Sequence, residues 1–189
     1  MLNRIARFSD ARILVVDDSL FTRRLISTAL KKAGFTKILT ADDGAEAVQK
    51  TYDFKPNLVL LDLKMPNLDG FGYCEMVRKD PELLRMPIIV QTELDDRQSR
   101  LHALSCGADD FLTKPLDMAE LTLRICVHIE RYFMLRDMKD MCDYLKMEID
   151  SVRGLRSEIK KLKVSSAKKG DMDNHFEVLE QLAHLTKIR

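Results

Sequence analysis

The sequence predicts an α/β fold in which a doubly wound sheet of five parallel strands carries helices on both faces. From Arg12 onward, short apolar runs alternate with segments of helical periodicity, which is the pattern of β-α units. The runs are apolar at almost every position, as expected for strands that are buried on both faces. Right-handed crossovers between such strands place helices on each side of the sheet. A chain of 189 residues accommodates one such domain with an appendage.

Each expected element follows from its own residues. The five apolar runs predict strands at 13–16, 38–41, 58–61, 88–90 and 111–112. The periodicity between them predicts helices at 20–33, 43–54, 70–79, 95–105 and from 117 onward. Ser19 stands where an N-cap is needed, and Gly34 and Gly107 follow expected C-termini. Residues 11–130 therefore form one domain of successive strand and helix pairs.

The last helix is longer than the sheet requires. Sequence that favours helix continues without proline from 117 to about 163, and its weak point is Gly154, which costs about 1 kcal/mol relative to alanine. Apolar residues along it follow the alternating four and three spacing of a coiled coil, with Arg156 as the discordant member. These residues are Met138, Cys142, Leu145, Ile149, Val152 and Ile159. We predict a coiled coil at 131–163 that joins two copies in a homodimer. The alternative is a helix that breaks near Gly154 or folds back on its own domain.

The remaining segments flank these two parts. Residues 1–10 form an N-terminal arm, and residues 164–174 interrupt the helical pattern and are interpreted as a linker. Residues 175–189 have the pattern of a short amphipathic helix, which can be the start of an output domain.

The composition excludes several classes of protein. The net charge is +1 and charged residues make up 32% of the chain, so charge does not indicate a nucleic-acid partner; the basic run at 151–169 is interpreted as a solvated helix end. The four cysteines have no CxxC spacing and no histidine at metal-ligand intervals, which argues against a zinc site or disulfides and favours the cytoplasm. No secretory signal and no membrane span is indicated.

Polar side chains gather where the expected strands end. The first strand leads into Asp17 and Asp18, the third into Asp62, the fourth into Thr92 and the fifth into Lys114. Because the carboxyl ends of parallel strands meet at one edge of a sheet, these side chains share one cleft. Three neighbouring carboxylates repel one another unless a cation neutralises them. Ligands that are all oxygen suit a hard ion, so we expect Mg²⁺ as the cofactor.

This set of residues predicts phosphoryl transfer. A carboxylate can attack phosphorus and form an aspartyl phosphate, and Asp62 is the best placed nucleophile. The Lys114 ammonium group and the Thr92 hydroxyl can stabilise the phosphoryl oxygens beside the metal. The first strand is followed by Asp-Asp-Ser-Leu-Phe at 17–21 and not by a glycine-rich loop, which argues against a nucleotide site.

The residues at these strand ends resemble the receiver domains of two-component response regulators over 11–130. The segments that carry the resemblance are Ile-Leu-Val-Val-Asp-Asp-Ser at 13–19, Leu-Val-Leu-Leu-Asp-Leu-Lys-Met-Pro-Asn-Leu-Asp-Gly-Phe at 58–71, Thr92, and Gly-Ala-Asp-Asp-Phe-Leu-Thr-Lys-Pro-Leu at 107–116. The resemblance implies a flavodoxin-like sheet with strand order 2-1-3-4-5. It also implies that a histidine kinase or a phosphotransfer protein is the partner.

The resemblance also implies a role for each matching residue. Asp62 is the phosphoacceptor, and the metal ligands are Asp17, Asp18, Asp62 and the backbone carbonyl of Lys64. Thr92 and Lys114 sense the phosphoryl group, Thr92 and Phe111 act as the switch, and the peptide bond between Lys114 and Pro115 is cis.

Two positions depart from the common family pattern. Glu93 follows Thr92 where most such domains have a small residue, so access of small phosphodonors and the rate of phosphate loss are expected to differ. Phe111 stands where many members have tyrosine, so this side chain can still change its packing but has no hydroxyl group to form a hydrogen bond.

The function predicted from the sequence is that of a non-enzymatic, phosphorylation-dependent switch. One alternative is a phosphohydrolase, but the better-known aspartate-based enzymes have a second Asp two residues after the nucleophile, where this chain has Lys64. Others are a phosphorylation-independent dimeric scaffold, a receiver that has lost phosphorylation, and the regulatory half of a larger cyclic-nucleotide or cyclic-di-GMP enzyme. Direct binding to nucleic acid or membrane is not expected.

Overall fold

The computed structural model describes residues 7–92, 102 and 104–169. The chain divides into two compact units, Met1–Arg136 and Asp137–Arg189. The first unit contains a five-stranded sheet with the order β2-β1-β3-β4-β5, in which every neighbouring pair is parallel. Its strands are β1 (Arg12–Val16), β2 (Lys37–Ala41), β3 (Leu58–Asp62), β4 (Ile88–Thr92) and β5 (Asp110–Thr113). The fold class and strand order expected from the sequence are confirmed.

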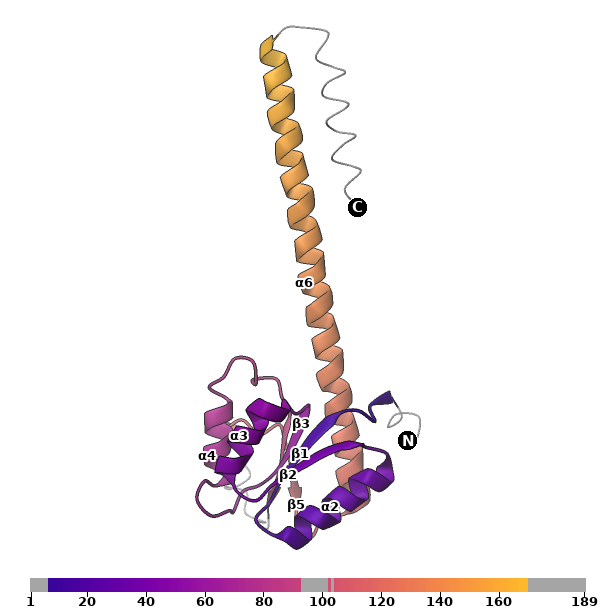
Figure 1. Ribbon diagram of the computed structural model, residues 1–189, viewed down its shortest axis with the longest axis vertical. Coiled ribbons are helices and arrows are strands. Elements are labelled where there is room, and N and C mark those ends of the chain that lie inside the picture. The colour runs from indigo at the N-terminus through magenta and orange to yellow at the C-terminus, as the bar shows by residue number, and fades with distance from the viewer. Residues whose placement is uncertain (1–6, 93–101, 103, 170–189) are drawn as a thin grey trace. The chain divides into compact units, whose positions relative to one another are not determined.

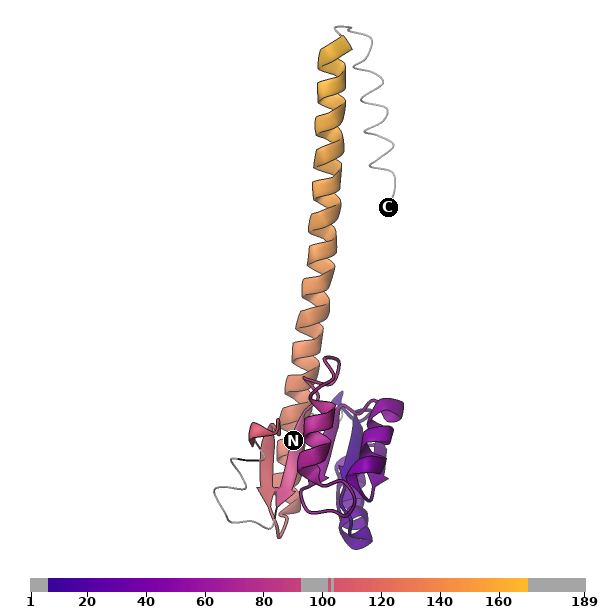
Figure 2. The ribbon, with the colours of Figure 1, turned by 90° about the vertical axis from the view of Figure 1, so that its left-hand side faces the viewer.

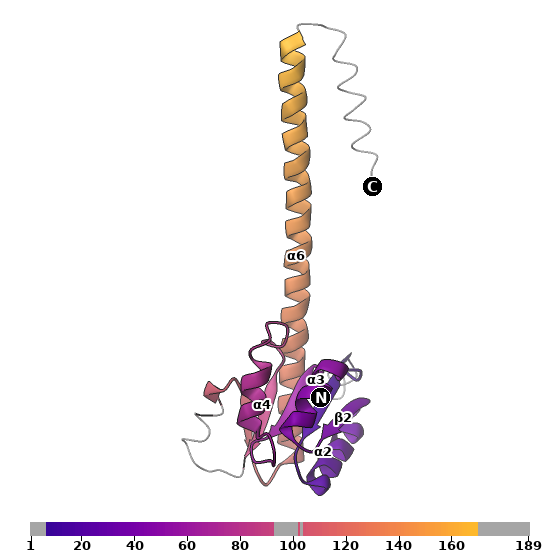
Figure 3. The same cartoon turned by 60° about the vertical axis from the view of Figure 1, so that its left-hand side comes forward.

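Helices connect these strands and cover both faces of the sheet (Figure 1). They are α2 (Leu20–Ala33), α3 (Gly44–Phe54), α4 (Gly70–Val77) and α6 (Met118–Lys169). Figures 1 and 2 show α3 and α4 on one face, and α2 with the first turns of α6 on the other. Figure 3 brings α3 and α4 forward and shows them side by side. The helix expected at 95–105 falls mostly outside the described residues.

Two apolar cores lie on opposite faces of the sheet because side chains alternate along each strand. One core joins Val15, Leu60 and Ile89 to residues of α2 and α6. The other joins Val16, Leu61 and Val90 to residues of α3 and α4. The three central strands are buried on both faces, which is why their sequences are almost continuously apolar.

Helix caps match the sequence signals. The Ser19 hydroxyl accepts a hydrogen bond from the backbone of Thr22 at the start of α2, as expected for an N-cap. Gly34 ends α2 with φ of 110°, a conformation that glycine adopts without steric cost. Asp43 and Asp69 cap α3 and α4 in the same way as Ser19 caps α2. These caps fix where each helix leaves the edge of the sheet that carries the site.

Helix α6 continues to Lys169, beyond the end expected at residue 163. The stretch 164–169 contains neither glycine nor proline, and the next glycine after Gly154 is Gly170. The helix is unbroken at Gly154. The rest of the expected linker, and the short helix expected at 175–189, lie outside the described residues.

Candidate phosphorylation site

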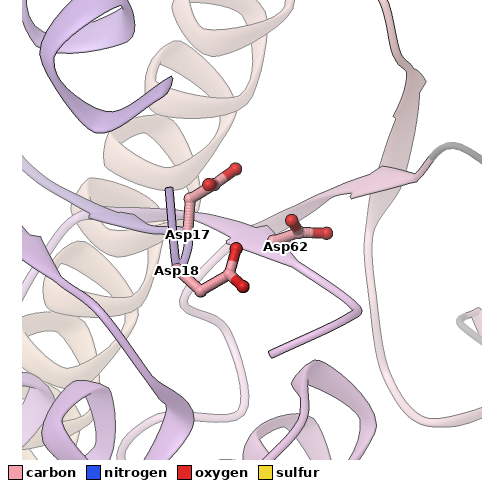
Figure 4. Close-up of side chains that lie close together, drawn as sticks. All are labelled: Asp17, Asp18 and Asp62. Carbon is pink, nitrogen blue, oxygen red and sulfur yellow. The ribbon is translucent and has the colours of Figure 1, made fainter. Parts of the chain in front are cut away.

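Three carboxylates meet at the carboxyl ends of β1 and β3. Asp17 and Asp18 follow the last residue of β1, and Asp62 is the last residue of β3. One oxygen from each lies within 4.8 Å of the others, and Figure 4 shows the three side chains gathered there. Asp17 and Asp62 are buried, whereas Asp18 is exposed. Among the described residues this is the one cluster of acidic, histidine or cysteine groups with the spacing of a metal site.

Lys114 reaches this cluster from the end of β5. Its Nζ atom donates to Asp62 Oδ2 at 2.6 Å and to Asp17 Oδ2 at 3.0 Å. The peptide bond between Lys114 and Pro115 is cis, as the resemblance implied. The structure therefore brings together Asp62, the pair Asp17 and Asp18, and the ammonium group of Lys114.

The pKa values of Asp17 and Lys114 show how the charges are balanced. Burial raises the pKa of Asp17 above the ordinary 3.8, even though Lys114 and the backbone N–H of Ser19 lower it. Burial alone would lower the pKa of Lys114, but the hydrogen bonds to Asp62 and Asp17 raise it, so the ammonium group stays charged. One ammonium group thus serves two buried carboxylates, and the site still favours a further cation.

The backbone around the acids is fixed by contacts that the sequence pattern did not predict. Arg23 of α2 donates from Nη1 to the carbonyl oxygens of Asp17 at 2.6 Å and Asp18 at 3.0 Å. The N–H of Ser19 donates to Asp17 Oδ1 at 2.9 Å. One arginine therefore fixes the turn between β1 and α2. In the sequence, Arg23 is a single basic residue inside an amphipathic helix and carries no motif.

Close packing also fixes the loop that follows Asp62. A Cβ atom at Gly70 would overlap the carbonyl oxygen of Asp62, so only glycine allows α4 to begin this close to β3. The side chain of Asn67, whose φ is 63°, donates to Asp43 Oδ2 at 2.7 Å. The N–H of Lys64 lies 3.3 Å from Asp62 Oδ1. The loop is thus held against the start of α3.

The two expected switch residues lie on the neighbouring strands β4 and β5. Thr92 is buried at the end of β4, and its carbonyl accepts a hydrogen bond from the N–H of Lys114 at 2.8 Å. Phe111 on β5 is half-buried and packs against the core on the α3 and α4 face. Glu93 lies outside the described residues.

The residues of the site fit a hard cation. All the ligands that the three acids offer are oxygens close enough to share one ion, and oxygen ligands are those that Mg²⁺ prefers. Asp18 keeps its carboxylate exposed, so an ion can reach it from solvent. The four cysteines are free thiols and none lies in this cluster.

A second charged cluster lies on β5 and α6. Arg124 donates from Nη1 to both carboxylate oxygens of Asp110, at 2.9 and 2.8 Å, and His128 Nε2 lies 3.1 Å from Asp110 Oδ2. Burial would raise the pKa of Asp110, but these two partners and the N–H of Phe111 outweigh it and lower the pKa. Sequence reasoning gave His128 no role, and here it helps to join β5 to α6.

The chain is similar to known proteins in sequence and in fold. A family model described as response regulator receiver domain matches residues 13–126. The chain is 44% identical over 114 residues to "Probable transcriptional regulator ycf27" of Cyanophora paradoxa, which is 60% of this chain and 46% of that protein. It is 41% identical over 115 residues to "Response regulator PleD" of Caulobacter vibrioides, covering 61% of this chain and 25% of that protein. The receiver domain of the Francisella response regulator 1452 matches with a TM-score of 0.60 at 30% identity, covering 65% of this chain and 98% of that one.

These comparisons limit what can be transferred to the whole protein. The chain spans about half the length, or less, of the curated relatives it matches. Because ycf27 is named a transcriptional regulator, the relatives do not support the expectation that nucleic acid is absent from the partners. In the part of the chain that the structure describes, no helix has the length and apolar character needed to cross a membrane.

Proposed function

This chain belongs to the response regulator receiver domain family, and from that membership and the geometry of its acidic cluster we propose that it is a phosphorylation-dependent signalling switch. Asp62 accepts a phosphoryl group from a histidine kinase or a phosphotransfer protein. The observation that carries the proposal is the meeting of Asp62 with Asp17, Asp18 and Lys114 at one edge of the sheet. The receiver itself acts as a phosphoacceptor and not as an enzyme on other substrates.

The chemistry follows from the positions of these side chains. A carboxylate oxygen of Asp62 attacks the phosphorus atom, and an O–P bond forms as the bond from phosphorus to the donor's histidine nitrogen breaks. The imidazole leaves with the electron pair of that bond. Lys114, already bonded to Asp62, places its positive charge next to the incoming phosphoryl oxygens. A Mg²⁺ ion held by Asp17, Asp18, Asp62 and the Lys64 carbonyl supplies charge neutralisation and orientation when bound.

Thr92 and Phe111 transmit the change. The Thr92 hydroxyl is proposed to bond a phosphoryl oxygen, which moves the end of β4 and the backbone of Lys114 that is bonded to it. Phe111 then changes its packing between β5 and the neighbouring core. Phosphorylation thus changes the charge at the site and shifts the balance between two conformations of β4 and β5.

The signal is proposed to pass to the extended last helix. Along α6, the side chains of Met138, Leu145, Ile149 and Val152 follow the coiled-coil spacing and are about half exposed, at 48–59%. Leaving a large apolar side chain in water costs about 1.5–3 kcal/mol relative to burial. We propose that a second copy covers this stripe in a parallel homodimer, and that phosphorylation changes the geometry of the paired helices.

The phosphoacceptor is tested by labelling the chain with acetyl phosphate in Mg²⁺ and in EDTA. The wild type is expected to gain one phosphoryl group in Mg²⁺ and none in EDTA. Asp62→Ala is expected to gain none in either, and Asp69→Asn, a change at the exposed cap of α4, serves as the matched control. Labelling of Asp62→Ala to the wild-type level would contradict the proposal.

A further inference from the structure

Gln91 is a buried polar residue without a partner. It lies on β4 next to Thr92, its exposed fraction is 0%, and neither its amide nitrogen nor its amide oxygen has a hydrogen-bond partner in the described structure. An amide that is buried without hydrogen bonds costs free energy. Buried polar groups in proteins are nearly always paired, so an exception calls for a physical explanation.

The sheet register places Gln91 on the same face as Asp62. Its partner on β3 is Asp62, and its partner on β5 is Leu112. Side chains alternate along a strand, so Gln91 shares a face with Ile89, which lies in the core beneath α2 and α6. Asp62 lies two residues after Leu60, which belongs to the same core, so Asp62 is on that face as well. The amide therefore lies on the same side of the sheet as the phosphoacceptor carboxylate.

Lys114 must cross this position to reach its partners. It follows β5, whereas Asp62 ends β3, and β4 lies between these two strands. The bond of 2.6 Å from Lys114 to Asp62 therefore runs across the end of β4. The residue of β4 that is in register with Asp62 is Gln91. Gln91 thus provides a neutral donor and acceptor on the strand that lies between Asp62 and Lys114.

We propose that Gln91 is a positioning residue of the phosphorylation site, whose amide oxygen accepts a hydrogen bond from Lys114 when a cation occupies the acidic cluster. The inference rests on the proposed function. In the present structure two of the three ammonium donors of Lys114 are used by Asp17 and Asp62. A cation that binds the same carboxylates competes for these oxygens. The lysine then needs another acceptor, and Gln91 offers one.

If Gln91 positions Lys114, its replacement changes Mg²⁺ affinity without lowering the stability of the cation-free chain. If Gln91 only supports the fold, its replacement lowers that stability. Gln91→Met keeps the length of the side chain and removes its polar atoms. Without a cation, this variant is expected to be at least as stable to urea as the wild type, because it removes an unpaired buried amide. With a cation, its Mg²⁺ affinity and its rate of labelling by acetyl phosphate are each expected to fall about threefold to tenfold, the effect of losing one net hydrogen bond.

Two further variants make the test specific. In a Lys114→Met background, Gln91→Met is expected to cause no further loss of Mg²⁺ affinity, because the partner of the amide is gone. Thr51→Val removes a different buried hydroxyl that is bonded to Tyr73, and it is expected to lower stability without changing Mg²⁺ affinity. The Mg²⁺ affinity is read from the urea midpoint at increasing Mg²⁺ concentration, which needs no phosphoryl transfer.

The inference is overturned if Gln91→Met lowers stability without a cation, if it leaves Mg²⁺ affinity unchanged, or if its effect persists in the Lys114→Met background. Failure of the proposed function is a different result: the wild-type chain takes no phosphoryl group at all. In that case the Mg²⁺ titration still decides whether Gln91 positions Lys114.

Discussion

Replacing Asp17 by asparagine is expected to stabilise the folded chain in the absence of Mg²⁺. At an effective dielectric constant of about 20, unit charges that lie within 4.8 Å of each other repel by at least about 3.5 kcal/mol, and the ammonium group of Lys114 at 3.0 Å attracts Asp17 by about 5.5 kcal/mol. Asp62 and Asp18 both repel Asp17. Solvent screens the repulsion from Asp18, because that carboxylate is exposed. The charge terms therefore nearly cancel, and the burial of the Asp17 carboxylate decides the sign.

Burial raises the pKa of Asp17, which also indicates that the charged carboxylate destabilises the folded chain. The folded chain binds a proton at Asp17 more tightly than the unfolded chain does, so this group contributes stability below its ordinary pKa of 3.8 that is lost as the pH rises through the raised value. At neutral pH the charged Asp17 costs stability. Asp17→Asn is expected to raise the free energy of unfolding in EDTA, because the uncharged amide avoids the cost of burying a charged carboxylate.

Urea denaturation at pH 7, in EDTA and in Mg²⁺, measures this effect. Mg²⁺ is expected to stabilise the wild type and to have little effect on Asp17→Asn, which lacks one of the three acids. Asp18→Asn is the matched control, because its carboxylate is exposed and its change in EDTA is expected to be small. A variant Asp17→Asn that is less stable than the wild type in EDTA would refute the reasoning.

Three other outcomes are expected. Lys114→Ala should be labelled slowly by acetyl phosphate and should hold its phosphoryl group without the change in amide resonances that the wild type shows; a variant that switches normally would remove Lys114 from the mechanism. Arg78→Met should lower the free energy of unfolding by about 2–4 kcal/mol in urea, because this side chain donates to three backbone carbonyls and one carboxylate around β4; a loss under 0.5 kcal/mol would disprove this role. Leu145→Asp with Ile149→Asp should abolish the dimer in sedimentation while the receiver stays folded, with Lys146→Asp as control; a wild-type chain that remains monomeric at high concentration would rule out the dimer.

The sheet and the acidic cluster could be predicted because they depend on local patterns. Buried parallel strands require apolar residues at nearly every position, and runs such as Leu58–Leu61 show this directly. Once the strands are placed, topology alone brings Asp17, Asp62 and Lys114 to one edge. The caps at Ser19 and Gly34 follow equally local rules.

Contacts that depend on the conformation of loops could not be predicted in this way. Arg23 and Arg78 look like ordinary surface arginines of amphipathic helices, and their backbone acceptors come from loops whose conformation no motif specifies. Gln91 lies just after the apolar run expected at 88–90, and the sequence does not show that its amide is buried without a hydrogen-bond partner. The end of α6 was placed at 163 because serines at 165 and 166 favour caps and turns, but the helix continues through them.

The central claim is that Asp62 carries the phosphoryl group, and chemical mapping of the modified residue tests it most directly. Borohydride reduces an acyl phosphate to an alcohol, so a chain labelled with acetyl phosphate in Mg²⁺ and then reduced should contain homoserine at one aspartate position. Peptide mass spectrometry is expected to find this change at Asp62 and to leave Asp17 and Asp18 unmodified. Reduction at either of those residues, or at none in a chain that has gained a phosphoryl group, would contradict the account.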